Sequence, residues 1–166
     1  MSDPKPTPEE TALWQRRLAS QANNRAWQLA EQPSRTAAED EEMLQAAHAA
    51  AFFWNIVGKA SNQAHAAQLL AHVYAYLGLA RPARHYLDRS FGYFTDPATA
   101  SAPWELAFAY AISAHVAARE GDAATHRAHY AQAQGLIAAL EDPEERAILE
   151  TTFRTLPVPM PVSTQA

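Results

Sequence analysis

Histidine is the residue type in this chain with the widest capacity for chemistry, and the 166 residues include seven histidines. Imidazole binds transition metals and acts as a base near neutral pH. His126 and His129 stand three residues apart, which places both rings on one face of a helix. However, the chain has no His-Glu-x-x-His motif and none of the Glu-x-x-His pairs that di-iron bundles use. A metal-dependent or otherwise enzymatic helical bundle around His126 and His129 is therefore an alternative, not the main prediction.

The sequence signatures of nucleophilic and phosphate chemistry are missing. The chain has no cysteine, no Gly-x-Ser-x-Gly elbow and no glycine-rich phosphate loop. Ser90, Ser101 and Ser113 stand in no sequence context that would activate a hydroxyl. We therefore predict a non-catalytic protein that uses no cofactor and no metal.

A repeat is the strongest pattern in the sequence. Three landmarks occur twice in the same order: an Ala-His-Val triplet, a glycine and a His-Tyr pair. Their positions are 71–73 with 114–116, Gly78 with Gly121, and 85–86 with 129–130. A repeat of this length around helix-forming residues is typical of stacked helical hairpins, which usually present a binding surface.

Composition predicts an all-α fold. Hydrophobic residues make up 48% of the chain, and much of that share is alanine. Alanine has the highest helix propensity and lets neighbouring helices approach closely. Runs of Val, Ile and Thr that are typical of strands are absent from the sequence.

Charge and cysteine usage narrow the setting. The absence of cysteine makes a reducing cytoplasm the simplest location. A net charge of −5 without a basic stripe argues against nucleic acid. The longest apolar run, residues 49–54, is too short to cross a bilayer, and no secretory signal begins the chain. We expect a soluble protein that binds neither nucleic acid nor membrane.

Capping residues, prolines and glycines divide the chain into about seven helices. They are expected over roughly residues 7–33, 35–57, 62–78, 81–95, 102–121, 122–140 and 142–156, with Asn62 as the N-cap of the third. Short connections pair the first six helices as hairpins, and the seventh caps the last hairpin. One domain of residues 9–156 is expected between a flexible leader, 1–8, and a flexible proline-rich tail, 157–166.

Residues 64–97 resemble a tetratricopeptide repeat, and residues 107–140 resemble a second, more divergent copy. The first copy matches the small and large positions of the two helices and the glycine between them at Leu70, Ala71, Tyr74, Gly78, Ala83, Leu87 and Ser90. The matching positions of the second copy are Tyr110, Ala114, Gly121, Tyr130 and Ala133. Residues 70–74 and 142–146 also resemble an uncharacterised bacterial group of helical-hairpin proteins. The resemblance implies a right-handed stack of antiparallel helical hairpins.

The resemblance also implies a binding site, because the first helix of each hairpin in such repeats lines the groove. Carried over by position, the lining residues are His65, Gln68, His72, Tyr76, Phe108, His115 and Arg119. The first four follow steps of three, four and four, so they share one helix face. A groove with His72 beside His115 would hold a carboxylate, more tightly at lower pH. The predicted function is a protein- or peptide-binding adapter, although partly buried spacers between alanine-rich helices would show the same residues.

Aromatic clusters leave a third interpretation open. Residues 52–54 read Phe-Phe-Trp and point in successive directions around their helix, so at least one ring leaves the core face. Four more aromatic residues, at 86, 91, 93 and 94, crowd the end of the fourth expected helix. Exposed aromatic side chains anchor interfaces, and a structural homodimer is therefore also compatible with the sequence.

Overall fold

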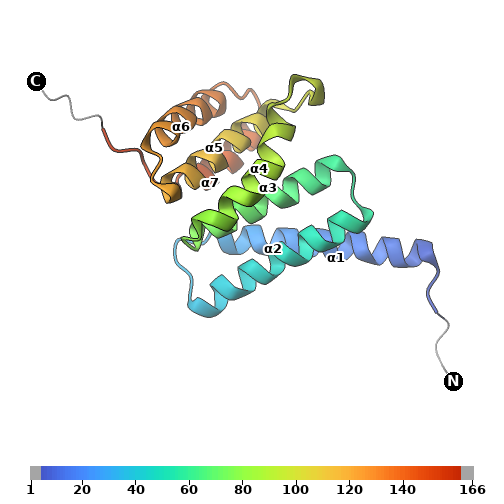
Figure 1. The fold of residues 1–166 in the computed structure, drawn as a ribbon. Helices are drawn as coiled ribbons and strands as arrows, with labels where there is room; N and C mark the ends of the chain where they lie inside the picture. The colour runs from blue at the N-terminus through green and yellow to red at the C-terminus, as the bar shows by residue number, and fades with distance from the viewer. Residues whose placement is uncertain (1–4, 162–166) are drawn as a thin grey trace, which may run out of the picture.

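The computed structural model describes residues 5–161, and all regular elements in that range are helices (Figure 1). The elements are α1 (Pro8–Ala30), α2 (Ala37–Val57), α3 (Ala60–Tyr76), α4 (Ala80–Thr95), the short 3₁₀ helix η1 (Pro97–Thr99), α5 (Pro103–Glu120), α6 (Ala123–Ala138) and α7 (Pro143–Phe153). Since these residues contain no strand, the predicted all-α class is confirmed. None of the helices combines the length and apolar character that crossing a bilayer would require. The outer parts of the predicted leader and tail, residues 1–4 and 162–166, lie outside the described residues.

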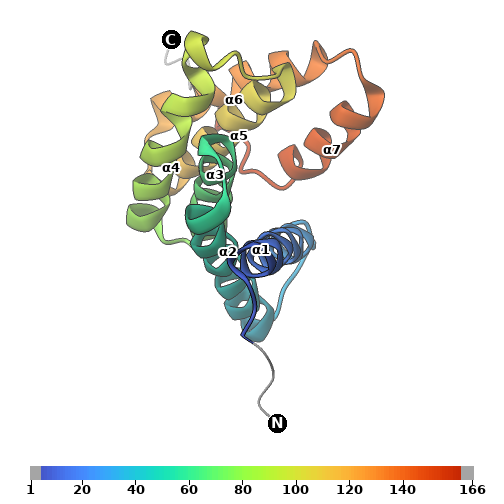
Figure 2. The ribbon, with the colours of Figure 1, turned by 90° about the vertical axis from the view of Figure 1, so that its right-hand side faces the viewer.

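Consecutive helices form hairpins that stack on one another. The hairpins are α1 with α2, α3 with α4, and α5 with α6, and neighbouring hairpins touch through α2–α3 and α4–α5. The first helices of the hairpins also contact each other, α1 with α3 and α3 with α5. The helix α7 packs on α5 and α6 and so continues the series of first helices on one side of the stack (Figure 2).

Two helices begin with the same reciprocal cap. The Thr7 hydroxyl accepts a hydrogen bond from the Glu10 amide at 3.2 Å, and the Glu10 carboxylate accepts one from the Thr7 amide at 2.8 Å. Thr36 and Glu39 repeat this arrangement at 3.3 and 2.7 Å. Each pair satisfies amides that the first turn of a helix leaves without a partner. The starts of α1 and α2 therefore agree with the sequence-based expectation.

The start of α3 differs from the prediction. Lys59, and not Asn62, is the N-cap residue, and the Asn62 side chain accepts a hydrogen bond from the Lys59 amide at 3.0 Å from inside the helix. The helix starts earlier because Gly58 lets the chain turn tightly behind α2. A Cβ atom at Gly58 would lie 2.5 Å from the carbonyl oxygen of Trp54.

The two copies of the repeat occupy equivalent places in α3 and α5. Both Ala-His-Val triplets are fully buried, residues 71–73 in α3 and 114–116 in α5. Gly78 and Gly121 follow the two helices with φ values of +73° and +77°, a left-handed conformation that favours glycine. The landmarks that occur twice in the sequence thus occupy equivalent positions in α3 and α5.

The aromatic residues of α4 are largely used inside the molecule. Phe94 is 2% exposed, and the ring of Phe91 stacks on His129 with centroids 5.4 Å apart. Tyr86 stacks on Tyr74 of α3 at 5.7 Å. In contrast, Phe52 on α2 is 61% exposed. The residues that the sequence offered as a possible dimer face are therefore divided between the interior and the surface.

Two glycine substitutions test the local backbone with opposite expected signs. Gly135 lies within α6 and an added Cβ atom meets nothing within 4 Å, so Gly135→Ala should raise the free energy of unfolding by about 0.5–1 kcal/mol. Gly121→Ala should lower it by about 1 kcal/mol, because alanine at φ +77° is strained. Urea denaturation followed by circular dichroism measures both values. A shift of the same sign in both variants would contradict these backbone assignments.

Candidate functional site

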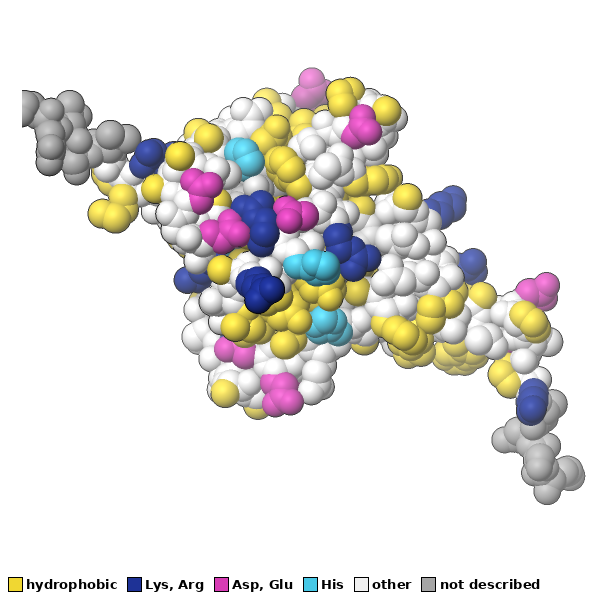
Figure 3. Space-filling view, viewed as in Figure 1, with side chains coloured by type: hydrophobic (Ala, Val, Ile, Leu, Met, Phe, Trp, Pro, Cys, Tyr) yellow, Lys and Arg dark blue, Asp and Glu magenta, His cyan; other side chains and the backbone are white. Residues whose placement is uncertain are grey.

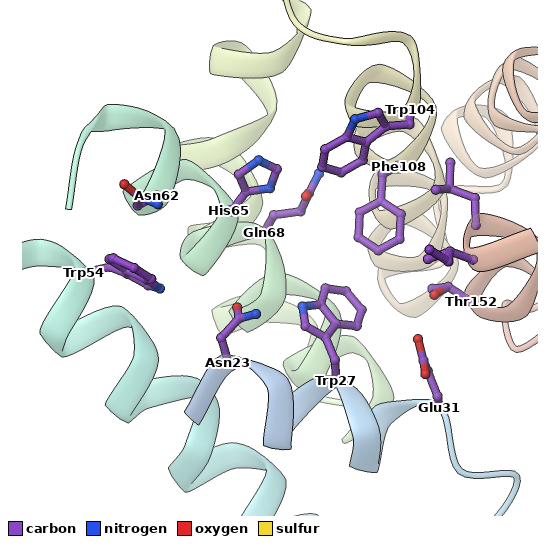
Figure 4. A pocket seen from close by; sticks show the side chains of 12 residues that line it. Asn23, Trp27, Glu31, Trp54, Asn62, His65, Gln68, Trp104, Phe108 and Thr152 are labelled. Atoms are coloured by element: carbon purple, nitrogen blue, oxygen red, sulfur yellow. The ribbon is translucent and has the colours of Figure 1, made fainter. Parts of the chain in front are cut away.

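The side of the stack formed by the first helices carries a hollow of about 460 Å³ (Figure 4). The helices α1 and α7 lie on either flank of α3 and α5, and no pair of described residues brings α1 into contact with α7. The hollow is the space that this separation leaves, and side chains of all four helices line it together with Trp54 of α2. Its volume lies within the range of about 300–1,000 Å³ typical of ligand pockets.

Aromatic side chains form most of the apolar wall. The rings of Trp27 on α1 and Phe108 on α5 meet edge to face with centroids 5.1 Å apart. Trp104 on α5 and Trp54 on α2 line other parts of the hollow, and Ile148 of α7, 61% exposed, extends the apolar surface to its rim. Such rings are the side chains that most often anchor a bound partner.

The Glu105 carboxylate positions the part of the wall that His65 and Trp104 form. The Glu105 Oε1 atom lies 2.8 Å from Nε2 of His65, and its second oxygen accepts a hydrogen bond from the Ala102 amide at 2.8 Å. The His65 ring stacks on Trp104 with an interplanar angle of 11° and centroids 5.6 Å apart. Glu105 therefore fixes both the start of α5 and the imidazole that supports Trp104.

Three carboxamide side chains face the hollow. Gln68 is 2% exposed, and its carboxamide lies between His65 and Trp104 without a hydrogen bond to any described residue (Figure 4). Asn23 and Asn62 carry two further carboxamides into the hollow from α1 and α3. Each of these already makes one internal hydrogen bond, Asn62 as acceptor from the Lys59 amide and Asn23 as donor to the Asn24 side chain. A carboxamide offers both a donor and an acceptor, so the Gln68 side chain can bind a ligand group that enters the hollow.

The structure divides the site residues that the sequence resemblance implied. Three of them, His65, Gln68 and Phe108, line the hollow. His72 and His115 do lie next to each other, with their Nδ1 atoms 3.2 Å apart, but both side chains are 0% exposed. They present no surface to a ligand in this structure.

Neighbouring aromatic and basic side chains close the groove over the histidine pair. The ring of Trp27 lies 5.4 Å from His72, and Tyr76 contacts both imidazoles with centroids 4.4 and 4.8 Å away. Tyr76 is itself covered by the Arg35 guanidinium at 4.9 Å and is hydrogen-bonded to Thr155, which follows α7. The last predicted lining residue, Arg119, is exposed in the final turn of α5 and does not line the hollow.

Burial changes the acid–base behaviour that the sequence suggested for this pair. Desolvation, with a contribution from His115, places the pKa of His72 well below its usual value. Desolvation and nearby Arg119 lower the pKa of His115 to about 3. Both imidazoles are therefore neutral at physiological pH, and the Nε2 atom of each lacks a hydrogen-bond partner within residues 5–161. The expected strengthening of carboxylate binding at lower pH has no basis in this geometry.

The histidines of the enzymatic alternative lie apart from the hollow. Nε2 of His126 lies 2.8 Å from the Pro157 carbonyl oxygen, and Nδ1 of His129 lies 2.7 Å from the Ser113 hydroxyl. Across residues 5–161, no three His, Asp or Glu side chains gather as a metal site would need. His126 instead holds the first residue of the predicted tail against α6.

The opposite face of the stack differs in character from the hollow. Figure 3 shows basic, acidic and histidine side chains mixed over α4 and its neighbours. Arg84 of α4 pairs there with Glu120 at 2.9 Å and with Asp88 at 3.5 Å. The charges on this face are thus partly matched to each other.

Sequence reasoning missed the contributions of α1 and α7. Trp27 and Asn23 come from α1, Glu31 directly follows α1, and Ile148, Leu149 and Thr152 come from α7. Neither helix belongs to the two repeat copies, so the repeat gave no position to carry over. The expected helices before and after the two copies could have indicated these positions, because α1 and α7 flank α3 and α5 as further first helices.

Comparisons with known proteins add no further assignment. A scan against protein-family models, a search of curated proteins and a search of solved structures each return no match.

The buried histidines predict a specific dependence of stability on pH. Burial also lowers the pKa values of His48 and His129, so the pKa values of four imidazoles are shifted in the same direction. At these four histidines the unfolded chain takes up protons near pH 6.5, and the folded chain does so only at lower pH. The free energy of unfolding should therefore be highest near pH 7 and fall as the pH drops towards 3. At pH 4.5, His115 alone should account for roughly 2–3 kcal/mol of that loss.

Urea denaturation at pH 7 and pH 4.5 measures this loss. His115→Asn should reduce the difference between the two pH values, whatever its effect at pH 7, because the variant lacks one imidazole that protonates only in the unfolded chain. The exposed His85 provides a matched control, His85→Asn. An equal pH difference in the wild type and His115→Asn would contradict the assignment.

Proposed function

We propose that this chain is a non-catalytic adapter that binds a peptide or a segment of another protein in the hollow between α1, α3, α5 and α7. The observation that carries the proposal is Gln68, a largely covered residue whose carboxamide atoms are accessible from the hollow and have no hydrogen-bond partner within the described chain. A peptide backbone supplies the N–H and C=O groups that such a side chain needs.

The distribution of groups around the hollow favours a chain-like ligand. Aromatic rings from three helices offer places for large apolar side chains, and the carboxamides of Asn23, Asn62 and Gln68 stand between them. Alternating apolar and hydrogen-bonding positions fit an extended segment, whose side chains and backbone groups also alternate. The resemblance to tetratricopeptide-like repeats supports this reading, because the hollow lies along the first helices of the hairpins. The chain without cysteine suits a reducing cytoplasm.

Selection from a random peptide library on the immobilised protein provides a direct test. Peptides recovered with the wild type should bind Gln68→Leu at least about tenfold more weakly, because the bound backbone would lose a buried hydrogen bond. Leucine keeps the size of the side chain, and Gln68 has no internal hydrogen bond to lose, so the melting temperature should not fall. Fluorescence polarisation of labelled peptides measures the affinities.

The matched control is Gln132→Leu on α6, where the side chain is exposed and lies outside the hollow. This variant should bind the selected peptides as the wild type does. The proposal fails if no peptide can be selected, or if the selected peptides bind Gln68→Leu and the wild type equally well.

A further inference from the structure

The lining of the hollow carries an unbalanced negative charge. Among its residues there is no lysine or arginine, and Glu31 is the only acidic residue. The one other ionisable lining residue, His65, is already matched with Glu105 at 2.8 Å. A ligand in the hollow therefore meets one carboxylate that no lining group neutralises.

Glu31 is placed to reach a ligand. It directly follows the last residue of α1, and its side chain points into the space between Trp27 and Thr152 of α7 (Figure 4). Its carboxylate makes no hydrogen bond or ion pair with any residue in the range 5–161. Glu31 is exposed at the rim of the hollow, and partial desolvation by its surroundings raises its pKa, which is the response of a carboxylate that lacks a cationic neighbour.

The nearest arginine in the sequence does not serve as that neighbour. The Arg35 guanidinium donates to Asp40 at 2.7 Å and to the carbonyl oxygens of Leu29 and Ala30 at 3.2 and 3.3 Å. Arg35 thus caps the end of α1 and pairs with the start of α2. It leaves the charge of Glu31 for another group.

Aromatic rings beside Glu31 add a second attraction for a cation. Trp27 precedes Glu31 by four residues, and the backbone of Glu31 continues the helical conformation of α1, so the two side chains lie on the same side. Trp27 also packs against Phe108 at 5.1 Å, which holds its ring in the wall of the hollow. A cation near such a ring is stabilised by the π electrons as well as by the carboxylate.

We propose that the segment bound in the hollow carries a basic side chain, lysine or arginine, that pairs with Glu31, while a large apolar neighbour fills the space between Trp27, Trp104 and Phe108. This inference rests on the proposed function and specifies the chemistry of the ligand. It predicts that peptides selected on the wild type are enriched in a basic residue next to a large apolar one.

A double-mutant cycle on a selected peptide tests the pairing. Replacing its basic residue by norleucine should weaken binding to the wild type by about threefold, because Glu31 is exposed and ion pairs of exposed carboxylates are weak. In Glu31→Gln, the same replacement should have little effect, because the carboxylate that recognises the cation is gone. Glu41→Gln is the matched control, since Glu41 is exposed on α2 outside the hollow. It should behave as the wild type does.

The outcomes separate this inference from the proposed function. If the selected peptides depend on Gln68 but lack a basic residue, or if the norleucine replacement costs as much in Glu31→Gln as in the wild type, the cation assignment is overturned and peptide binding stands. If no selected peptide depends on Gln68, the proposed function falls and this inference falls with it.

Discussion

The close contact between α3 and α5 is the constraint on which the rest of the structure depends. Alanine side chains of the two helices, such as Ala71 and Ala107, are fully buried in one core cluster and let the backbones approach. The approach is close enough to bring Nδ1 of His72 within 3.2 Å of Nδ1 of His115. Because these two helices form the centre of the stack, the positions of α1 and α7 on their flanks follow from this contact, and so does the hollow between those flanks.

The same arrangement leaves one end of the groove closed and the other open. At the closed end, Tyr76 covers the histidine pair and is held by Arg35 and by Thr155. At the open end, Gln68 and Phe108 lie beneath a space that no side chain of α1 or α7 fills. The segment after α7 therefore helps to decide how much of the groove is accessible, because Thr155 contributes to the closed end.

The sequence predicted the starts of α1 and α2 well because their causes are local. Thr7 and Thr36 each stand three residues before a glutamate, the spacing that a capping box uses. Asn62 misled the prediction for the opposite reason. Its side chain accepts a hydrogen bond from the Lys59 amide from inside the helix. The close approach at Gly58 that allows the earlier start depends on the fold around Trp54.

The sequence predicted only part of the candidate site. The repeat placed His72 beside His115, since equivalent positions of neighbouring copies meet in a stack. Their depth was not predictable, because it is set by Trp27 and Tyr76, and Trp27 comes from a helix outside the repeat. Glu31 was not predicted as a site residue, because it also lies outside the repeat. In sequence it is an ordinary glutamate near a helix end, and only the fold places it beside the hollow.

The neutrality of the histidine pair gives Glu31 its importance. Protonated imidazoles at the centre of α3 and α5 would place positive charge close to the hollow and offset a carboxylate at its rim. Burial instead keeps His72 and His115 uncharged above their lowered pKa values. The closed end of the groove therefore supplies no charge to the open end, and the polar character of the hollow is set by its carboxamides and by one carboxylate. A ligand that matches this pattern must bring hydrogen-bonding groups to the middle of the hollow and a positive charge to the end of α1.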